Sequence, residues 1–277
     1  MSTLREPVLV IQPSRVWFRL DLAALWQYRE LLYFLVWRDV KVRYKQTAIG
    51  ATWAILQPLM TMIIFTAIFA HFAKIPSDGL PYPIFAYTAL LPWIYFASAL
   101  NRSSGSVVSE AHLISKIYFP RVILPLAGTV SGIIDFAIAF VLLVGMMSWY
   151  EIMPTWGLLA LPLFLLLAFA TALAVGLWCS ALHVRYRDVG LTVPFLTQCW
   201  MNASPVAYPV SLVPENWRFF YSLKPMAGVI EGFRWALLGK QVPDFGVMAI
   251  SAVVVALLLV SGLVFFKHME RTFVDVV

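Results

Sequence analysis

Charged residues are scarce in this sequence. Asp, Glu, Lys and Arg make up 12% of the 277 residues, whereas about a quarter of a soluble domain is normally charged. Hydrophobic residues account for 61%, and the mean hydropathy is +0.83. This composition excludes an ordinary water-soluble domain.

Cysteine and histidine are also rare. The only two cysteines, Cys179 and Cys199, fall within apolar stretches, so we interpret them as small buried residues and not as a disulfide or metal pair. The four histidines are scattered without ligand spacing: His71, His112, His183 and His268. We therefore expect no metal site.

Catalytic groups are too sparse for a convincing active site. A membrane glycosyltransferase needs several loop carboxylates to bind a metal and a sugar nucleotide. Here Asp39, Glu110 and Asp188 lie in three separate segments. The G-x-S-x-G and H-E-x-x-H signatures do not occur, and neither does a G-x-x-x-x-G-K-[ST] loop for ATP. We predict no catalytic residue and favour transport, with an intramembrane glycosyl- or acyltransferase as the alternative from another class.

Long apolar stretches dominate what is present. A helix that crosses a bilayer needs about 20 mostly apolar residues. Six stretches qualify: 52–72, 84–100, 122–147, 157–182, 191–207 and 245–266. The sequence therefore predicts an all-α polytopic membrane protein with a single transmembrane domain over residues 1–277, in which residues 52–266 form a six-span core.

Two other segments are predicted to lie at the membrane surface. Residues 1–21 are a polar lead-in, and residues 22–47 interleave aromatic with basic residues at helical spacing. This pattern predicts an interfacial amphipathic helix, although a simple anchor for the first span explains it equally well. Residues 204–240 combine prolines with many aromatics, so we predict a re-entrant helical hairpin in the outer leaflet, broken near Lys224 and Pro225. Residues 267–277 form a tail.

The distribution of positive charge predicts the orientation. If both termini are cytoplasmic, fifteen of the 20 Lys and Arg residues lie inside, as the positive-inside rule requires. The remaining five lie outside: Lys74, Arg218, Lys224, Arg234 and Lys240. The basic excess is therefore assigned to topology and to contact with anionic lipid headgroups, not to nucleic acid.

Asp135 is the only acidic residue deep inside a predicted span. An unpaired charge there costs about 2.5–3.5 kcal/mol on insertion scales, so we expect Asp135 to face the protein interior, to be paired or to be protonated. It could be a proton site or line a pathway, as in a proton-coupled carrier, or it could only fix helix packing. Arg102 and Arg121 fall at span ends, where they are expected to snorkel towards the headgroups.

Several segments of this sequence resemble segments of a known family, and they occur in the same order along the chain. They are residues 37–58 (WRDVKVRYKQTAIGATWAILQP), 113–121 (LISKIYFPR), 184–188 (VRYRD), 204–209 (SPVAYP) and 225–239 (PMAGVIEGFRWALLG). The chain resembles the permeases of ABC transporters that export polysaccharides, and the O-antigen branch more than the capsule branch. The similarity runs from about residue 30 to the C terminus.

The resemblance implies a homodimer in a bacterial inner membrane, paired with two copies of a cytoplasmic ABC ATPase. The implied cargo is a glycan on undecaprenyl pyrophosphate or a related lipid carrier, moved from the cytoplasm to the outer side. This chain would carry no cofactor, because the partner binds ATP and Mg. A permease for a lipid or a drug is the alternative within transport.

The resemblance also suggests roles for individual residues. A coupling helix around residues 110–119 would dock on the ATPase, and the coupling residues would be Glu110, His112, Leu113, Lys116, Tyr118, Arg185 and Arg187. The interfacial helix would act as a gate, in which Arg38, Lys41, Arg43 and Lys45 meet the lipid pyrophosphate; lipid anchoring explains these cations equally well.

A hydrated glycan chain can stack its C–H faces on aromatic rings as it moves through a channel. The candidate channel residues are Tyr87, Trp93, Phe96, Trp200 and Tyr208. Packing or a position at the membrane interface is the alternative for each one.

Overall fold

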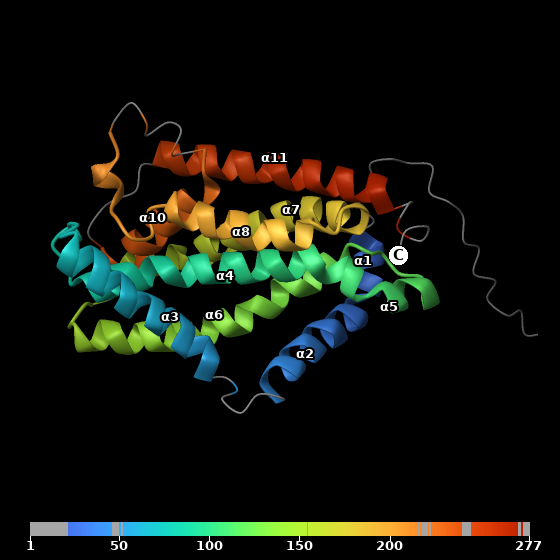
Figure 1. Ribbon diagram of the computed structural model, residues 1–277, viewed down its shortest axis with the longest axis horizontal. Coiled ribbons are helices and arrows are strands. Elements are labelled where there is room, and N and C mark those ends of the chain that lie inside the picture. Colours follow the sequence, from blue (N-terminus) through green and yellow to red (C-terminus); the bar gives the residue numbers. More distant parts are fainter. Residues whose placement is uncertain are drawn as a thin grey trace, which may run out of the picture.

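The computed structural model describes residues 22–45, 50, 52–153, 155–214, 217, 221, 223–239, 245–270 and 273. Within these residues all regular elements are helices, and the longest run side by side (Figure 1). In chain order they are α1 (Leu22–Gln27), α2 (Arg29–Lys45), α3 (Thr52–Phe65), which continues as the π-helix η1 (Thr66–Phe72), α4 (Tyr82–Ser109), α5 (Ala111–Lys116), α6 (Ile123–Trp149), η2 (Trp156–Ala160), α7 (Leu161–Arg185), α8 (Val189–Asn202), η3 (Val210–Leu212), α10 (Pro225–Leu238) and α11 (Phe245–Glu270).

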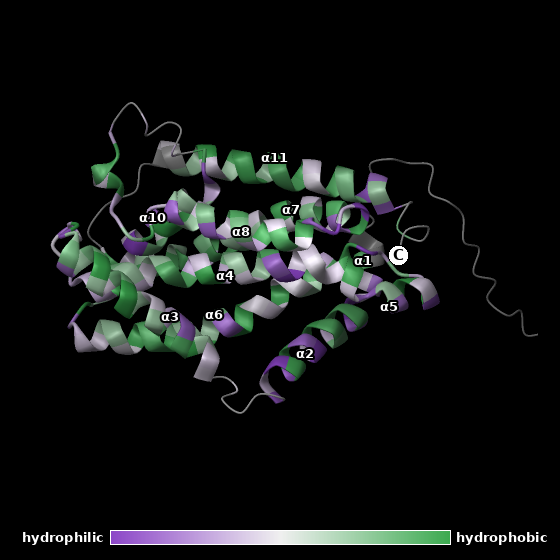
Figure 2. Cartoon of the chain, viewed as in Figure 1, coloured by the Kyte–Doolittle hydropathy of each residue, from purple (hydrophilic) through white to green (hydrophobic). Residues whose placement is uncertain are grey.

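Five helices in the described residues are long and apolar enough to cross a membrane. They cover Thr52–Phe72, Tyr82–Ser109, Ile123–Trp149, Trp156–Arg185 and Met248–Glu270, and apolar residues dominate their surfaces (Figure 2). These helices correspond to the first four and the last of the predicted spans. They confirm the prediction of an all-helical polytopic membrane protein.

The remaining predicted span, residues 191–207, forms a shorter helix than expected. Helix α8 has 14 residues and ends at Asn202, so it rises about 21 Å, less than the roughly 30 Å of a hydrocarbon core. The backbone leaves the helix before Pro205 and Pro209, where the missing amide hydrogens and fixed φ angles disfavour its continuation. Residues 203–207 are therefore not part of a straight span.

Helix α4 occupies the centre of the bundle, with α6, α7, α8 and α10 around it (Figure 1). In its most apolar stretch 78% of the residues are buried, against 11% for the helix formed by α3 and η1. Helix α6 approaches closely because Gly128 has no side chain: a Cβ there would lie 3.0 Å from the backbone nitrogen of Ser103. Small residues such as glycine are common where membrane helices touch, because they let the two backbones approach closely.

The predicted interfacial helix is divided in two. A turn at Tyr28 separates α1 from α2, and α2 lies at an angle to the bundle against α6 (Figure 1). Its Leu35 and Val40 are buried, while Tyr33, Phe34 and Trp37 are 50–69% exposed. Exposed aromatics beside a membrane bundle are typical of a helix in the headgroup layer. Residues 46 and 47 of the predicted segment lie outside the described residues.

The predicted hairpin over residues 204–240 is only partly described. Within this segment α10 begins at Pro225, where the sequence predicts a break, and it is followed by Gly239 in the left-handed conformation (φ 68°); a hairpin is not confirmed. Proline suits the first turn of a helix and glycine its end. The predicted first arm includes residues 215–216, 218–220 and 222, which lie outside the described residues. The same holds for residue 240, for the lead-in 1–21 and for residues 271–272 and 274–277 of the tail.

Candidate functional site

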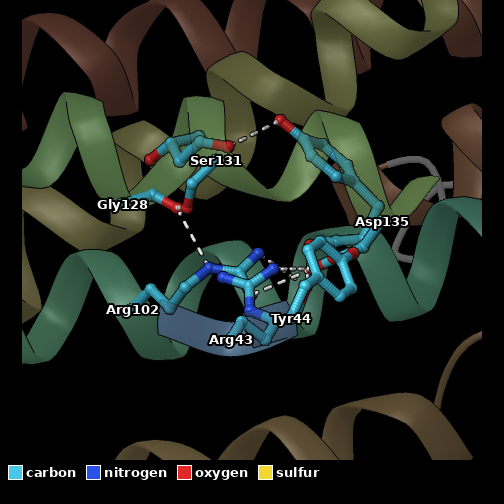
Figure 3. Close-up of polar contacts among 9 residues, drawn as sticks. Arg43, Tyr44, Arg102, Gly128, Ser131 and Asp135 are labelled. Atoms are coloured by element: carbon cyan, nitrogen blue, oxygen red, sulfur yellow. Dashed lines mark hydrogen bonds and ion pairs between the residues drawn. The ribbon is translucent and has the colours of Figure 1, made fainter. Parts of the chain in front are cut away.

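Asp135 on α6 is the centre of a polar cluster at the junction of α2, α4 and α6 (Figure 3). Arg43, at the end of α2, and Arg102, on α4, both form ion pairs with Oδ2 of Asp135; the Arg102 Nη1–Oδ2 distance is 3.4 Å. The hydroxyl of Tyr44 donates a hydrogen bond to Oδ1. We call these four residues the Asp135 cluster. Asp135 is therefore paired, one of the three states expected from the sequence.

The position of Arg102 corrects the expectation that it snorkels at a span end. Helix α4 continues to Ser109, so Arg102 lies about two turns inside it. Its Nε donates to the carbonyl of Gly128 at 3.2 Å and its Nη2 to Oγ of Ser98 at 3.1 Å. Gly132, one turn further along α6, leaves room for the guanidinium, because a Cβ at that position would clash with Nη2 of Arg102. Arg102 is thus fixed between two helices with its charge beside Asp135.

Tyr44 remains a hydrogen-bond donor at neutral pH. Burial raises the pKa of Tyr44 to about 12, and the hydrogen bond to Asp135 acts in the same direction. Burial has this effect because it disfavours the charged phenolate. The phenol therefore stays protonated and supplements the two guanidinium groups as a neutral donor to the carboxylate.

A cavity of about 540 Å³ opens beside the Asp135 cluster, between α2, α3, α4 and α6. Arg43, Arg102 and Asp135 form part of its lining, which is otherwise mostly apolar. The other lining residues are Tyr44, Gly50, Trp53, Ala54, Gln57, Pro58, Leu91, Ile94, Tyr95, Ser98, Phe136 and Ala139. Ligand pockets are typically about 300–1,000 Å³, with few polar groups on apolar walls. The cavity has the size and the lining of a ligand site.

A second ion pair connects α2 to the end of α4. Arg38 binds the carboxylate of Glu110 with both terminal nitrogens: Nη2–Oε1 is 2.5 Å and Nη1–Oε2 is 3.1 Å. Asp39 also accepts from Arg38 Nη2, at 3.0 Å. The hydrogen bond to Glu110 raises the pKa of Arg38 above its ordinary value. Glu110, predicted to face the ATPase, is therefore engaged by the predicted gate helix of its own chain.

The four predicted gate cations are not gathered at one point. Arg43 belongs to the Asp135 cluster and Arg38 to the pair with Glu110. Lys41 and Lys45 are exposed on α2. Of the four predicted gate cations, only Arg43 lies at the cavity beside the Asp135 cluster, and it is joined there by Arg102, which was not among the predicted gate cations.

The other predicted coupling residues lie at one end of the bundle. Helix α5 and the connection between α7 and α8 are both at the right in Figure 1, and α5 packs through Ile114. Five of the predicted residues are exposed and Leu113 is half-buried; the exposed ones are His112, Lys116, Tyr118, Arg185 and Arg187. The carbonyl of Tyr118 also accepts a hydrogen bond from Tyr28, at 3.2 Å.

The predicted channel aromatics lie mainly in the core of the chain. Trp93 and Phe96 are buried and meet the ring of Trp200, with centroids 5.1–6.2 Å apart. Tyr87 is fully buried and donates to the carbonyl of Ala139 at 3.0 Å. Tyr208 lines a different cavity, of about 620 Å³, together with Tyr221, Trp217 and Lys224. In this structure the first four are packing residues, and the aromatics beside the Asp135 cluster are Trp53, Tyr95 and Phe136.

In the described part of the chain, no three His, Cys, Asp or Glu side chains lie close enough together to hold a metal ion. Cys179 is half-buried, whereas Cys199 is exposed on α8, so the expectation that both cysteines are buried is wrong for Cys199.

Comparison with known proteins places these features in a family. Residues 30–238 match the model of the ABC-2 type transporter family. The chain is 29% identical over 251 residues to the O-antigen export system permease protein RfbA of Myxococcus xanthus, covering 89% of this chain and 95% of the relative. It is 20% identical to the polysialic acid transport protein KpsM of Escherichia coli (84% and 91% covered).

It is also 23% identical to the capsule polysaccharide export inner-membrane protein CtrC of Neisseria meningitidis (76% and 80% covered). The matched family model covers most of the chain and includes α2, the Asp135 cluster, α5 and α10. The chain therefore belongs to the ABC-2 type transporter family and is a multi-pass membrane transport subunit, not an enzyme, of a kind that carries no cofactor and pairs with an ABC ATPase.

Proposed function

We propose that this chain is the permease subunit of an ATP-driven exporter that moves a lipid-linked, O-antigen-like polysaccharide across the bacterial inner membrane. The observation that carries this proposal is the similarity over most of the chain to proteins named for O-antigen export, polysialic acid transport and capsule polysaccharide export. The cavity beside the Asp135 cluster supports it, because a site with two guanidinium groups and apolar walls suits a lipid that bears phosphate.

The working assembly in this proposal is a homodimer with two copies of the ATPase. Both termini are cytoplasmic, so α5 and the connection between α7 and α8 face the ATPase. The exposed His112, Lys116, Arg185 and Arg187 are the surface that contacts it. Basic side chains at this end agree with the positive-inside rule.

Helix α2 is the gate in this proposal, and its two ion pairs define how it works. Arg38 links α2 to Glu110, next to the first residue of α5, and Arg43 links α2 to Asp135 beside the cavity. Motion of α5 against the ATPase would therefore be transmitted to α2 through the ion pair between Arg38 and Glu110. Lys41 and Lys45 remain exposed for lipid headgroups.

Deletion of the gene for this chain in its host bacterium tests the proposed function. We expect the deletion strain to lose surface polysaccharide, measured by immunoblot of intact cells, and to accumulate lipid-linked glycan inside. The wild-type chain should restore export, and affinity purification should recover a partner with a P-loop and ATPase activity. Normal surface polysaccharide in the deletion strain, together with a changed efflux of a lipid or a drug, would instead establish the alternative permease.

A further inference from the structure

Helix α5 has little packing of its own to hold it in place. It has six residues, and Ile114 is the one buried residue among them. The backbone that follows, residues 117–120, is not helical, and Tyr118 within it is 72% exposed. The position of α5 on the bundle therefore depends on the contacts at its two flanks. The contact before α5 is the ion pair between Glu110 and Arg38.

The contact after α5 is made by Arg121, which lies just before α6 and is held by the end of α11. The backbone amide of Arg121 donates a hydrogen bond to Oε1 of Glu270 at 3.2 Å, and its Nη1 donates to the backbone carbonyl of Glu270. The carboxylate therefore lies at the positive end of the α6 dipole, and the guanidinium lies at the negative end of the α11 dipole. Since the last carbonyls of a helix have no partner within that helix, each of the two helix ends caps the other.

Phe273 completes this arrangement from three residues beyond Glu270. Its side chain is fully buried, and its ring centroid lies 5.4 Å from that of Phe266 and 5.8 Å from Cζ of Arg121. A guanidinium is attracted to an aromatic ring, more strongly where water is excluded. Phe273 also belongs to the same buried apolar cluster as Ile114 of α5, and α11 ends at the same end of the bundle as α5 (Figure 1). We call Arg121, Glu270 and Phe273 the α6–α11 clasp.

We infer that the α6–α11 clasp is a second attachment for coupling: it fixes the start of α6 to the last span, so that motion of α5 moves α6 together with α11 instead of bending residues 117–120. The inference rests on the proposed role of α5 as the coupling helix. Glu270 and Phe273 are positioning residues in this role, because they act through Arg121. Since α6 contains Asp135, a movement that the clasp delivers to α6 reaches the cavity between α2, α3, α4 and α6.

The geometry of the clasp predicts the result of a charge exchange. In an ordinary ion pair between two side chains, Arg121→Glu combined with Glu270→Arg restores part of what either single variant loses. In the clasp each side chain bonds to the backbone of the other residue, and after the exchange each charge lies at the helix end that repels it. The double variant should therefore couple no better than either single variant. Recovery in the double variant would show an ordinary ion pair and would overturn the inference.

Milder replacements test the positioning role. Phe273→Ala empties the buried site beside Arg121, whereas Phe273→Leu keeps an apolar side chain there. Arg121→Gln removes a charged hydrogen bond, which lowers the occupancy of the closed clasp by about tenfold. Phe265→Ala is the matched control, because it also removes a ring from α11, one that stacks on Trp178 of α7 at 4.2 Å. Each variant is first shown to elute as a single species and to bind the ATPase.

Two measurements are made on each variant. A nitroxide label at Ser115→Cys, an exposed position of α5, reports the mobility of α5 by EPR spectroscopy of the purified full-length chain, in which the two native cysteines are replaced. Export per ATP hydrolysed, in proteoliposomes that contain the ATPase, reports coupling. We expect Phe273→Ala and Arg121→Gln to increase the mobility of the label and to lower export per ATP severalfold while ATP hydrolysis persists. Phe273→Leu and the control should resemble the wild type.

Each of the opposite outcomes overturns the inference in a different way. Unchanged mobility of the label shows that the clasp does not hold α5, and increased mobility with unchanged export per ATP shows that coupling does not depend on it. An equal loss of coupling in Phe265→Ala assigns the effect to general destabilisation. The EPR spectra need neither the ATPase nor the glycan. An absence of export by the wild-type chain therefore contradicts the proposed function and leaves the test of the clasp by EPR unaffected.

Discussion

Exchanging the charges of Arg38 and Glu110 tests whether the gate helix is tied to the end of α4. Arg38→Glu alone puts a third carboxylate beside Asp39 and Glu110, and Glu110→Arg alone puts two cations together. Both single variants should therefore be destabilised. The double variant restores opposite charges at the two positions and should recover part of the loss.

The expected size of this effect follows from the exposure of the pair. The side chain of Arg38 is 37% exposed and that of Glu110 is 19% exposed. Exposed ion pairs contribute about 0.2–1 kcal/mol, whereas hydrogen bonds to charged groups in drier sites reach about 1.5–3 kcal/mol. The two hydrogen bonds between Arg38 and Glu110 favour the range of about 1.5–3 kcal/mol, but solvent around the exposed part of Arg38 screens the interaction. We therefore expect a coupling energy of about 1 kcal/mol between the two residues.

The assay is a double-mutant cycle on the free energy of unfolding of the purified chain in mixed micelles. Effects that add within about 0.3–0.5 kcal/mol would show that Arg38 and Glu110 do not interact, and the reasoning would then be refuted. Glu30→Arg is the matched control, because Glu30 is an exposed carboxylate in the first turn of the same helix. Its reversal should cost only the small interaction with the helix dipole.

The same variants distinguish two explanations of Glu110. If Glu110 acts through α2, Glu110→Arg should uncouple ATP hydrolysis from export and Arg38→Glu should restore part of the coupling. If Glu110 instead contacts the ATPase directly, the second substitution should bring no recovery. Export per ATP hydrolysed in proteoliposomes is the measurement.

Three further predictions concern packing, the half-buried arginine of α10 and the orientation of the chain in the membrane. Gly232→Ala should lower the free energy of unfolding by about 1–3 kcal/mol, because its Cβ would meet a ring of α7, whereas Gly145→Ala, with open space around it, should be neutral or slightly stabilising. Arg234→Gln should cost about 1–3 kcal/mol in chemical unfolding, since its guanidinium donates to two backbone carbonyls of the segment after α8. In a chain without native cysteines, an impermeant maleimide should label Ser77→Cys in intact cells and Ser115→Cys only after permeabilisation.

Each of these three predictions has an outcome that would contradict it. Equal losses at the two glycines would remove steric contact as the cause. An unchanged unfolding curve for the α10 variant would show that the carbonyls are satisfied without the guanidinium. Labelling with the opposite sidedness would reverse the proposed orientation.

The long helices could be predicted because their length is a requirement of the membrane. A run such as residues 122–147 must be helical throughout to satisfy its backbone in lipid, and α6 has nearly those bounds. The run 191–207 is a poorer guide, because hydropathy counts Ala203, Val206 and Ala207 as span residues. The prolines at 205 and 209 contradict that assignment, and the helix ends before them.

The candidate site could not be assembled from the sequence because its members are distant in the chain. Arg102 lies 33 residues from Asp135 and Arg38 lies 72 from Glu110. A local pattern identified Asp135 as unusual, yet its partners depend on how α2 and α4 pack on α6. The central position of α4 is likewise a property of the packing, which buries Tyr87 and Trp93, two of the predicted channel residues, in the core of the chain.

The ion pair between Arg102 and Asp135 has a consequence for the biogenesis of the chain. The ribosome makes α4 before α6, so Arg102 enters the insertion machinery when its counter-ion does not yet exist. An unpaired arginine in a membrane-spanning helix costs up to about 2.5–3.5 kcal/mol on insertion scales, the value at the helix centre, and 78% of the most apolar stretch of α4 is buried by other parts of the chain. We therefore expect α4 to wait at the translocon until α6 emerges, so that the two helices are released into the bilayer as a hairpin that has already neutralised its own charge.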